Sequence, residues 1–166
     1  MRPIGLITAL ALLASCTEAK QDPPVVVSSN VVQWSLANHT ARRGPGNSVL
    51  ADVEIHAVVE KGWHLYALTQ VGGGPTTLTM NVKPPYRLDG DVMGPTPDKA
   101  QDPNFGIETE TYSGSPIFRA AVKLDDSAAL PPPPIEIDIR WQACSDNLCL
   151  PVRKTMISIT PFIADA

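Results

Sequence analysis

The stretch Ser48-Val-Leu-Ala-Asp-Val-Glu-Ile-His-Ala-Val-Val-Glu60 decides the fold, because apolar and polar residues alternate along it. A period of two is typical of a β-strand with one buried face. The stretch therefore predicts a strand that packs on a core. The apolar positions that would share the buried face are Val49, Ala51, Val53, Ile55, Ala57 and Val59, and the polar positions opposite them are Asp52, Glu54, His56 and Glu60.

Strand-like segments recur along the chain and are separated by glycine- and proline-rich turns. The 17 prolines are about twice the usual share, and no segment makes a convincing amphipathic helix. We predict an all-β fold, an immunoglobulin-like antiparallel β-sandwich in a single domain. Residues 42–47 and 94–105 are expected to be loops, and Pro131–Pro134 an extended connector. The other expected strands are residues 31–37, 63–68, 76–82, 86–92, 116–124, 135–141 and 152–160.

The segment Trp141-Gln-Ala-Cys-Ser-Asp-Asn-Leu-Cys-Leu-Pro151 joins the last two expected strands. A hairpin there would bring Cys144 and Cys149 to roughly 4.5–5.5 Å at Cα, a distance that a disulfide can span. The bridge has two interpretations: a structural staple of an exported domain, or a redox pair that cycles between dithiol and disulfide. Its loop of only four intervening residues would remove little chain entropy, and its place on a turn would let a partner's sulfur reach it.

Residues 1–15 have the features of a secretory signal, with a positive start and an apolar run, Ile4 to Leu13, that is too short to span a membrane. Leu13-Ala-Ser-Cys16 resembles the lipobox of bacterial lipoproteins, which predicts cleavage before Cys16 and a diacylglycerol on its sulfur. The alternative is an ordinary signal peptide that happens to contain a cysteine. With Cys16 lipidated, the other two of the three cysteines remain as one pair.

Residues 16–30 would then be a lipid-anchored flexible tether, and residues 31–166 the folded domain. Thr17, after the lipidated position, slightly favours the outer membrane over the inner one. No later segment approaches about 18 apolar residues, so membrane contact is expected through the lipid alone. A formal net charge of −4 without a run of Lys or Arg argues against nucleic acid as a partner.

Four motifs together resemble the N-terminal periplasmic domain of the DsbD-type thiol:disulfide interchange proteins. They are Gly62-Trp-His-Leu-Tyr66, Asp102-Pro-Asn-Phe-Gly106, Glu110-Thr-Tyr112 and the cysteine segment, and they occur in this order. The resemblance covers roughly Val31 to Pro161, and the cysteine segment is its specific part. It implies an immunoglobulin-like domain in the periplasm that passes electrons by thiol–disulfide exchange.

The resemblance also implies roles for individual residues. Cys149 would form the mixed disulfide with partners, and Cys144 would resolve it. Asp102 to Gly106, with Asn104 within it and Phe105 at its tip, would be a cap loop that closes over the cysteines; the alternative is an ordinary solvated loop. His64 and Tyr66 would share a strand face beside the cysteines, although plain surface or core positions explain them equally well.

This chain departs from the family pattern in two respects. The acidic pair that the family can carry in the cap loop is reduced to Asp102, so proton handling by that loop is in doubt. The chain also has no membrane or thioredoxin-like domain after Pro161, so electrons would come from a separate membrane protein, with thioredoxin-like periplasmic proteins as partners.

Another class of function remains open: a non-catalytic immunoglobulin-like binding or assembly lipoprotein with a structural disulfide. Neither a cofactor nor a metal is expected. His39 and His56 lack the spacing of zinc ligands, and no phosphate-binding glycine loop is present.

Overall fold

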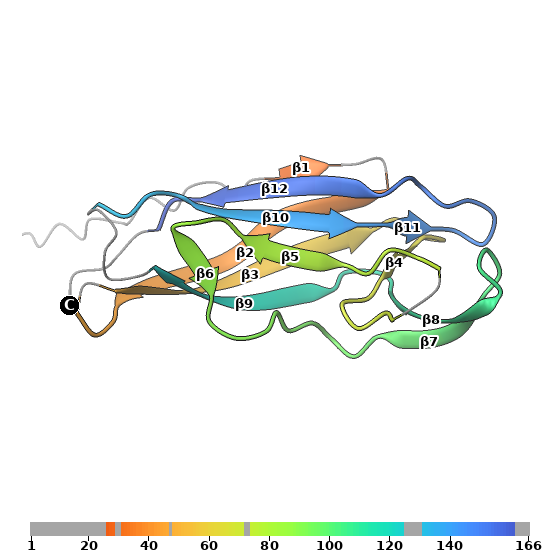
Figure 1. Ribbon diagram of the computed structural model, residues 1–166. Helices are drawn as coiled ribbons and strands as arrows, with labels where there is room; N and C mark the ends of the chain where they lie inside the picture. The colour runs from red at the N-terminus through yellow and green to blue at the C-terminus, as the bar shows by residue number, and fades with distance from the viewer. Residues whose placement is uncertain (1–25, 29–30, 47, 72–73, 125–130, 162–166) are drawn as a thin grey trace, which may run out of the picture.

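The computed structural model describes residues 26–28, 31–46, 48–71, 74–124 and 131–161, and these residues form strands, turns and loops without a helix. All strand pairs are antiparallel, in three sheets (Figure 1). The five-stranded sheet contains β1 (Val26–Ser28), β2 (Val32–Arg43), β3 (Val49–Val59), β9 (Ile117–Leu124) and β6 (Tyr86–Leu88), in this order. The three-stranded sheet contains β12 (Arg153–Ile159), β10 (Ile135–Trp141) and β5 (Thr79–Val82). The four-stranded sheet contains β11 (Ala143–Cys144), β4 (His64–Tyr66), β8 (Ile107–Tyr112) and β7 (Asp98–Asp102).

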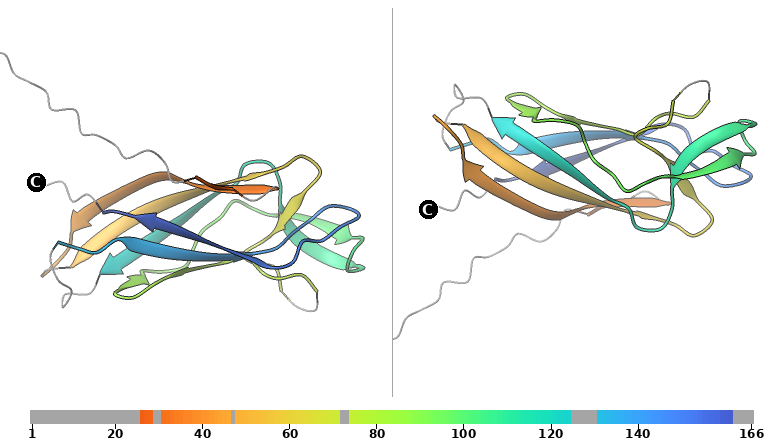
Figure 2. Two further views of the ribbon diagram at one scale, coloured as in Figure 1. Left: turned by 90° about the horizontal axis from the view of Figure 1, so that it is seen from above. Right: turned by 90° about the horizontal axis from the view of Figure 1, so that it is seen from below.

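The five-stranded and three-stranded sheets pack face to face, and the four-stranded sheet lies at one end of this elongated sandwich (Figure 2). Aromatic rings join the layers: the centroid of Trp34 on β2 lies 6.2 Å from that of Trp141 on β10 and 5.9 Å from that of Phe118 on β9. All three side chains are buried. The expectation of an immunoglobulin-like antiparallel sandwich is confirmed.

The alternation along β3 is confirmed in full. Every second residue from Val49 to Val59 is buried in the core, whereas Asp52, Glu54 and His56 lie outside it. β10 follows the same rule, with Ile135, Ile137 and Ile139 buried and paired with β12. Apolar side chains on one face of each sheet are removed from water together, and this burial is the main stabilising term of such a fold.

Three expectations about local structure are wrong. β2 does not end near residue 37; it continues through Arg43, past a bulge between Leu36 and Asn38, into the segment predicted as a loop. The predicted loop 94–105 contains strand β7. Val26–Ser28, placed in the tether, pair with β2 as strand β1; the rest of residues 16–30, and Cys16 with them, lie outside the described residues.

The sequence of β7 shows no strand pattern, and the reason is its position in the sheet. Four of its five residues are exposed, because β7 is the edge strand of its sheet and has no core face. β7 is held in the sheet by backbone pairing with β8, in the register Asp98↔Thr111 to Asp102↔Ile107. Gly106 closes this hairpin with a φ of +68°, a conformation that glycine adopts without a steric penalty. Hydrophobic periodicity carries no signal for such a strand.

Among the residues that the structure describes, no helix has the length and apolar character needed to cross a membrane.

Candidate functional site

Cys144 and Cys149 form a disulfide at the end of the sandwich where β10 ends and β11 begins (Figure 1). Their Cα atoms are 4.1 Å apart, slightly closer than the hairpin estimate. Cys144 is fully buried, whereas Cys149 is partly exposed. The two half-cystines therefore differ in their access to solvent.

The turn between the cysteines is held by its own hydrogen bonds. The amide of Ser145 donates to the carbonyl of Leu148 at 2.8 Å, and the Ser145 hydroxyl accepts from the Leu148 amide at 3.2 Å. The side chain of Leu148 points into solvent and is 57% exposed. The turn thus presents an apolar side chain directly beside Cys149.

Strand β4 places His64 and Tyr66 beside the disulfide. The register pairs Cys144 with His64 and Ala143 with Leu65. Directly opposite residues of an antiparallel pair project from the same face, with Cβ atoms about 4.5–5.5 Å apart. His64 and Tyr66 are two residues apart on β4, and their ring centroids are 5.3 Å apart.

Asp102, at the end of β7, is a buried carboxylate surrounded by donors. Oδ2 accepts the Tyr66 hydroxyl at 2.6 Å, and Oδ1 accepts the backbone amides of Asn104 at 2.8 Å and Phe105 at 3.3 Å. The side chain is 1% exposed, and Oδ2 also lies 3.7 Å from His64 Nε2. Burying a carboxylate is costly unless such partners satisfy it, so this network fixes the end of the β7–β8 hairpin against β4.

These contacts shift the pKa values of the three titratable groups. Burial alone would raise the pKa of Asp102, but the hydrogen bonds that it accepts, together with nearby His64, outweigh burial and lower it. Burial, followed by the hydrogen bond to Asp102 and the charge of that carboxylate, raises the pKa of Tyr66. Burial lowers the pKa of His64 below 6.5, while Asp102 and Asp146 oppose this effect. Near neutral pH, the network therefore contains a carboxylate, a phenol and a neutral imidazole.

The turn after Asp102 contacts the cysteine turn directly. Asn104 Nδ2 donates to the carbonyl of Ser145 at 2.8 Å. The ring of Phe105 packs edge-on against Tyr66, with centroids 6.0 Å apart, and lies so close to Gly74 that a Cβ there would be 2.9 Å from it. The structure thus brings together the described residues that the sequence singled out: Cys144, Cys149, His64, Tyr66, Asp102, Asn104 and Phe105.

Two contributors to this site had no predicted role. Gln142 joins separate segments, because its Oε1 accepts the amide of Thr76 at 2.8 Å and its Nε2 donates to the carbonyl of Leu150 at 3.1 Å. Gly74 leaves room for Phe105, although its segment predicts only a flexible break. Both roles depend on contacts between distant segments, which no local pattern reveals.

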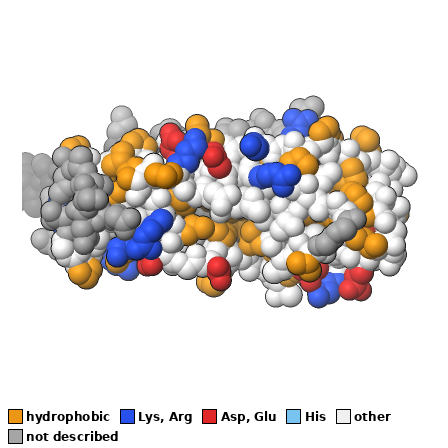
Figure 3. Space-filling view, viewed as in Figure 1, with side chains coloured by type: hydrophobic (Ala, Val, Ile, Leu, Met, Phe, Trp, Pro, Cys, Tyr) orange, Lys and Arg blue, Asp and Glu red, His pale blue; other side chains and the backbone are white. Residues whose placement is uncertain are grey.

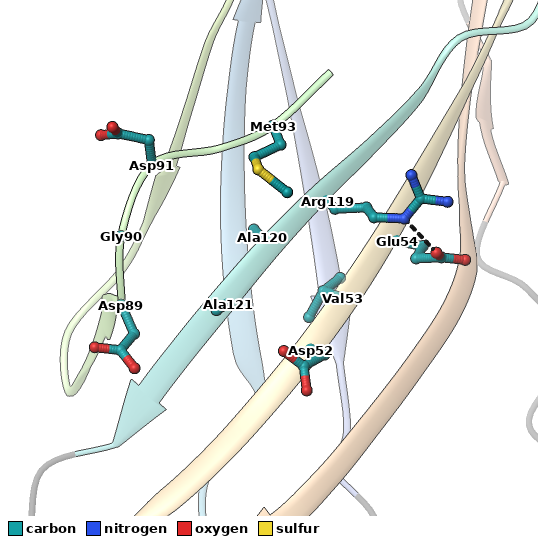
Figure 4. Close-up of a pocket in the computed structure, with 10 residues that line it drawn as sticks. All are labelled: Asp52, Val53, Glu54, Asp89, Gly90, Asp91, Met93, Arg119, Ala120 and Ala121. Atoms are coloured by element: carbon teal, nitrogen blue, oxygen red, sulfur yellow. Dashed lines mark hydrogen bonds and ion pairs between the residues drawn. The ribbon is translucent and has the colours of Figure 1, made fainter. Parts of the chain in front are cut away.

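Other features of the described residues lie away from the cysteines. A hollow of about 500 Å³ lies on the five-stranded sheet, between β3, β9 and the segment after β6 (Figure 4). Arg119 Nε donates to Glu54 Oε1 there at 2.7 Å. No group of three or more His, Cys, Asp or Glu within the described ranges is arranged to hold a metal ion.

Comparison with known families identifies the chain. The family model for the N-terminal part of the thiol:disulfide interchange protein DsbD matches residues 40–161. The chain belongs to this family. A comparison with curated proteins gives no match.

One solved structure of low identity shares the fold of this chain. The N-terminal periplasmic domain of ScsB from Proteus mirabilis is 17% identical, with a TM-score of 0.54 over 81% of this chain and 49% of that chain. This chain therefore spans about half of that structure. The N-terminal domain of Neisseria meningitidis DsbD in the reduced form is 16% identical, with a TM-score of 0.48 over 65% of this chain and 75% of that one.

The buried carboxylate generates a prediction about stability and pH. Asp102→Asn keeps the shape of the side chain but removes its charge, so the folded domain should lose about 1.5–3 kcal/mol of stability at pH 7, the range for hydrogen bonds to a charged group. A carboxyl whose pKa is lowered by folding stabilises the protein above its unfolded pKa and loses that effect as the pH falls through the folded value. The difference between wild type and variant should therefore shrink below pH 3.8, the ordinary value for this group.

Urea unfolding at a series of pH values measures this difference. Asp98→Asn is the matched control, because Asp98 lies on the same strand but is exposed, and it should change stability little. A difference for Asp102→Asn that stays constant from pH 7 to pH 3 would contradict the role of its charge.

Proposed function

We propose that this protein is a thiol–disulfide exchange protein that passes electrons through Cys144 and Cys149. Electrons would come from a membrane reductase or a thioredoxin-like protein and would reduce oxidised periplasmic proteins. The observation that carries the proposal is the unequal burial of the two cysteines in a domain of the DsbD N-terminal family. Exchange needs one sulfur that a partner can reach and a second sulfur close by.

The unequal burial supports the assignment of roles. Cys149, the partly exposed residue, would attack a partner's disulfide as a thiolate, forming a mixed disulfide and releasing one partner thiolate. Cys144 would then attack Cys149 Sγ and release the second partner thiolate. The partner gains two electrons, and the domain returns to its disulfide form.

The segment Asp102 to Gly106 would act as the cap over this pair. Two contacts support this role: the hydrogen bond from Asn104 to the Ser145 carbonyl, and the packing of Phe105 on Tyr66. Closed, the cap would restrict access of small oxidants to the reduced cysteines. A partner would displace it, at the cost of these few contacts.

The surface around the cysteines suits a protein partner. Leu148 and Val152 are exposed on either side of Cys149, and Val71, 86% exposed, lies on the segment after β4. Hydrophobic side chains also gather toward this end of the face shown in Figure 3. Apolar side chains of this kind mark sites of protein association when they cluster.

We further propose that the mature protein is a periplasmic lipoprotein. Residues 1–15 would be its signal peptide, Cys16 its lipidated residue and residues 16–30 most of its tether. The lipobox-like sequence before Cys16 supports the anchor, and the similarity to the periplasmic domain of ScsB supports the compartment. Thr17, which follows the lipidated residue, favours an anchor in the outer membrane over one in the inner membrane.

The exchange mechanism predicts that Cys144→Ala will trap partners. Without the resolving thiol, Cys149 should stay joined to a partner's sulfur, so a covalent adduct should accumulate when the variant meets an oxidised thioredoxin-like protein. Non-reducing electrophoresis before and after dithiothreitol detects it. Cys149→Ala is the matched control and should trap far less, because its remaining cysteine is buried. Equal trapping by both variants, or none by either, would contradict the assigned roles and favour a structural disulfide in a binding lipoprotein.

The cap predicts that Asn104→Ala will expose Cys149. Loss of one hydrogen bond of about 0.5–1.5 kcal/mol should raise the open population, and with it the alkylation rate of Cys149, by about two- to tenfold. Iodoacetamide labelling in the Cys144→Ala background measures this rate on a single thiol. Asn81→Ala, at an exposed position of β5, should leave the rate unchanged. Identical rates for both variants would mean that Asn104 does not hold a cap closed.

A further inference from the structure

The resolving step needs a base, because Cys144 is fully buried. Only a thiolate attacks a disulfide, and burial in an apolar environment disfavours the charged form of a thiol. Water has poor access to this sulfur and so cannot readily accept its proton. A proton acceptor inside the site would allow the Cys144 thiol to become a thiolate.

His64 is the side chain in position to accept that proton. It lies directly opposite Cys144 in the β4–β11 register, so the two side chains project from the same face of the sheet as near neighbours. Its side chain is only 20% exposed. Within the described part of the chain, its Nε2 is buried without a hydrogen-bond partner, although buried polar atoms are almost always paired.

Burial lowers the pKa of His64, but two nearby carboxylates oppose this effect and favour the protonated imidazole. Nε2 lies 3.7 Å from Oδ2 of the buried Asp102 carboxylate, and Asp146 on the cysteine turn also acts on it electrostatically. The third titratable neighbour, Tyr66, donates its own proton to Asp102 and stays uncharged. Among the described residues, the two charged groups that act on the imidazole, Asp102 and Asp146, are both negative. If the proton of the neutral imidazole is on Nε2, the nitrogen nearer Asp102 Oδ2, then Nδ1 is the basic nitrogen.

We propose that His64 is the proton acceptor for Cys144 when the mixed disulfide is resolved, and that Asp102 stabilises the imidazolium that forms. This inference rests on the proposed exchange function. In the step, the Cys144 thiol proton passes to the neutral imidazole, and the Cys144 sulfur bonds to Cys149 Sγ. The bond between Cys149 and the partner breaks, and its electron pair leaves on the partner's sulfur. That thiolate, or solvent, then takes the proton from His64.

The reaction of the reduced domain with dithiobis(nitrobenzoate) separates the two steps. Attack by Cys149 releases the first coloured thiolate, and attack by Cys144 on the mixed disulfide releases the second. Stopped-flow absorbance records both phases. In His64→Gln the first phase should be unchanged, whereas the second should slow by at least about tenfold, since general base catalysis contributes about 10²–10⁴ in rate.

The pH dependence distinguishes proton transfer from a structural role. In the wild type, the second phase should level off above the pKa of His64, which burial lowers below 6.5, and should slow as His64 becomes protonated at lower pH. In His64→Gln, it should instead rise steadily with pH through the neutral range, because hydroxide replaces the imidazole. His64→Asn should repeat this change in profile. His39→Gln, on β2, is the control and should behave as the wild type.

The outcomes separate this inference from the function on which it rests. Two phases whose rates and pH profiles are the same in His64→Gln, His64→Asn and wild type would overturn the role of His64 and leave the exchange function intact. A wild-type disulfide that cannot be reduced without unfolding would overturn the exchange function itself. Thermal unfolding of each oxidised variant, expected within a few degrees of the wild type, verifies that the phases are measured on folded protein.

Discussion

The burial of Trp141 is the constraint on which the cysteine site depends. Its ring packs against Trp34 of the opposite sheet, and its Nε1 donates to Thr155 at 3.1 Å. It is the last residue of β10, and only Gln142 separates it from β11. Because the core holds Trp141, the next residues leave the three-stranded sheet in a fixed direction and join the four-stranded one. The disulfide is therefore held on a rigid core, and the turn between the cysteines reaches solvent.

A second constraint is the carboxylate of Asp102. A buried negative charge requires partners, and Asp102 finds them on β4 and in the turn that follows β7. The same side chain thus orders the candidate cap and faces His64. In the proposed mechanism, the base for Cys144 is His64, which lies opposite it in the β4–β11 register, and the Asp102 carboxylate stabilises the imidazolium.

The sequence predicts those parts of the molecule that have a buried face. β3 and β10 alternate between core and solvent, so their pattern is explicit, and the bridge between Cys144 and Cys149 follows from the hairpin that β10 and β12 form. β7 could not be predicted in this way, since its exposed edge leaves no periodicity. The contacts of Gln142 and Gly74 were also hidden, because each joins segments that are distant in the sequence. The cap residues were found through the family motif, whereas their hydrogen bonds required the fold.

The reduction potential of the Cys144–Cys149 pair in the folded, unlipidated domain tests the central claim most directly. Equilibration with thioredoxin and glutathione buffers, followed by thiol alkylation, gives its value. An exchanging pair should lie between about −270 mV and about −180 mV, the potentials of thioredoxin and protein disulfide isomerase. A value below about −300 mV, typical of structural disulfides, would contradict the account and leave Cys144 and Cys149 as a staple of the sandwich.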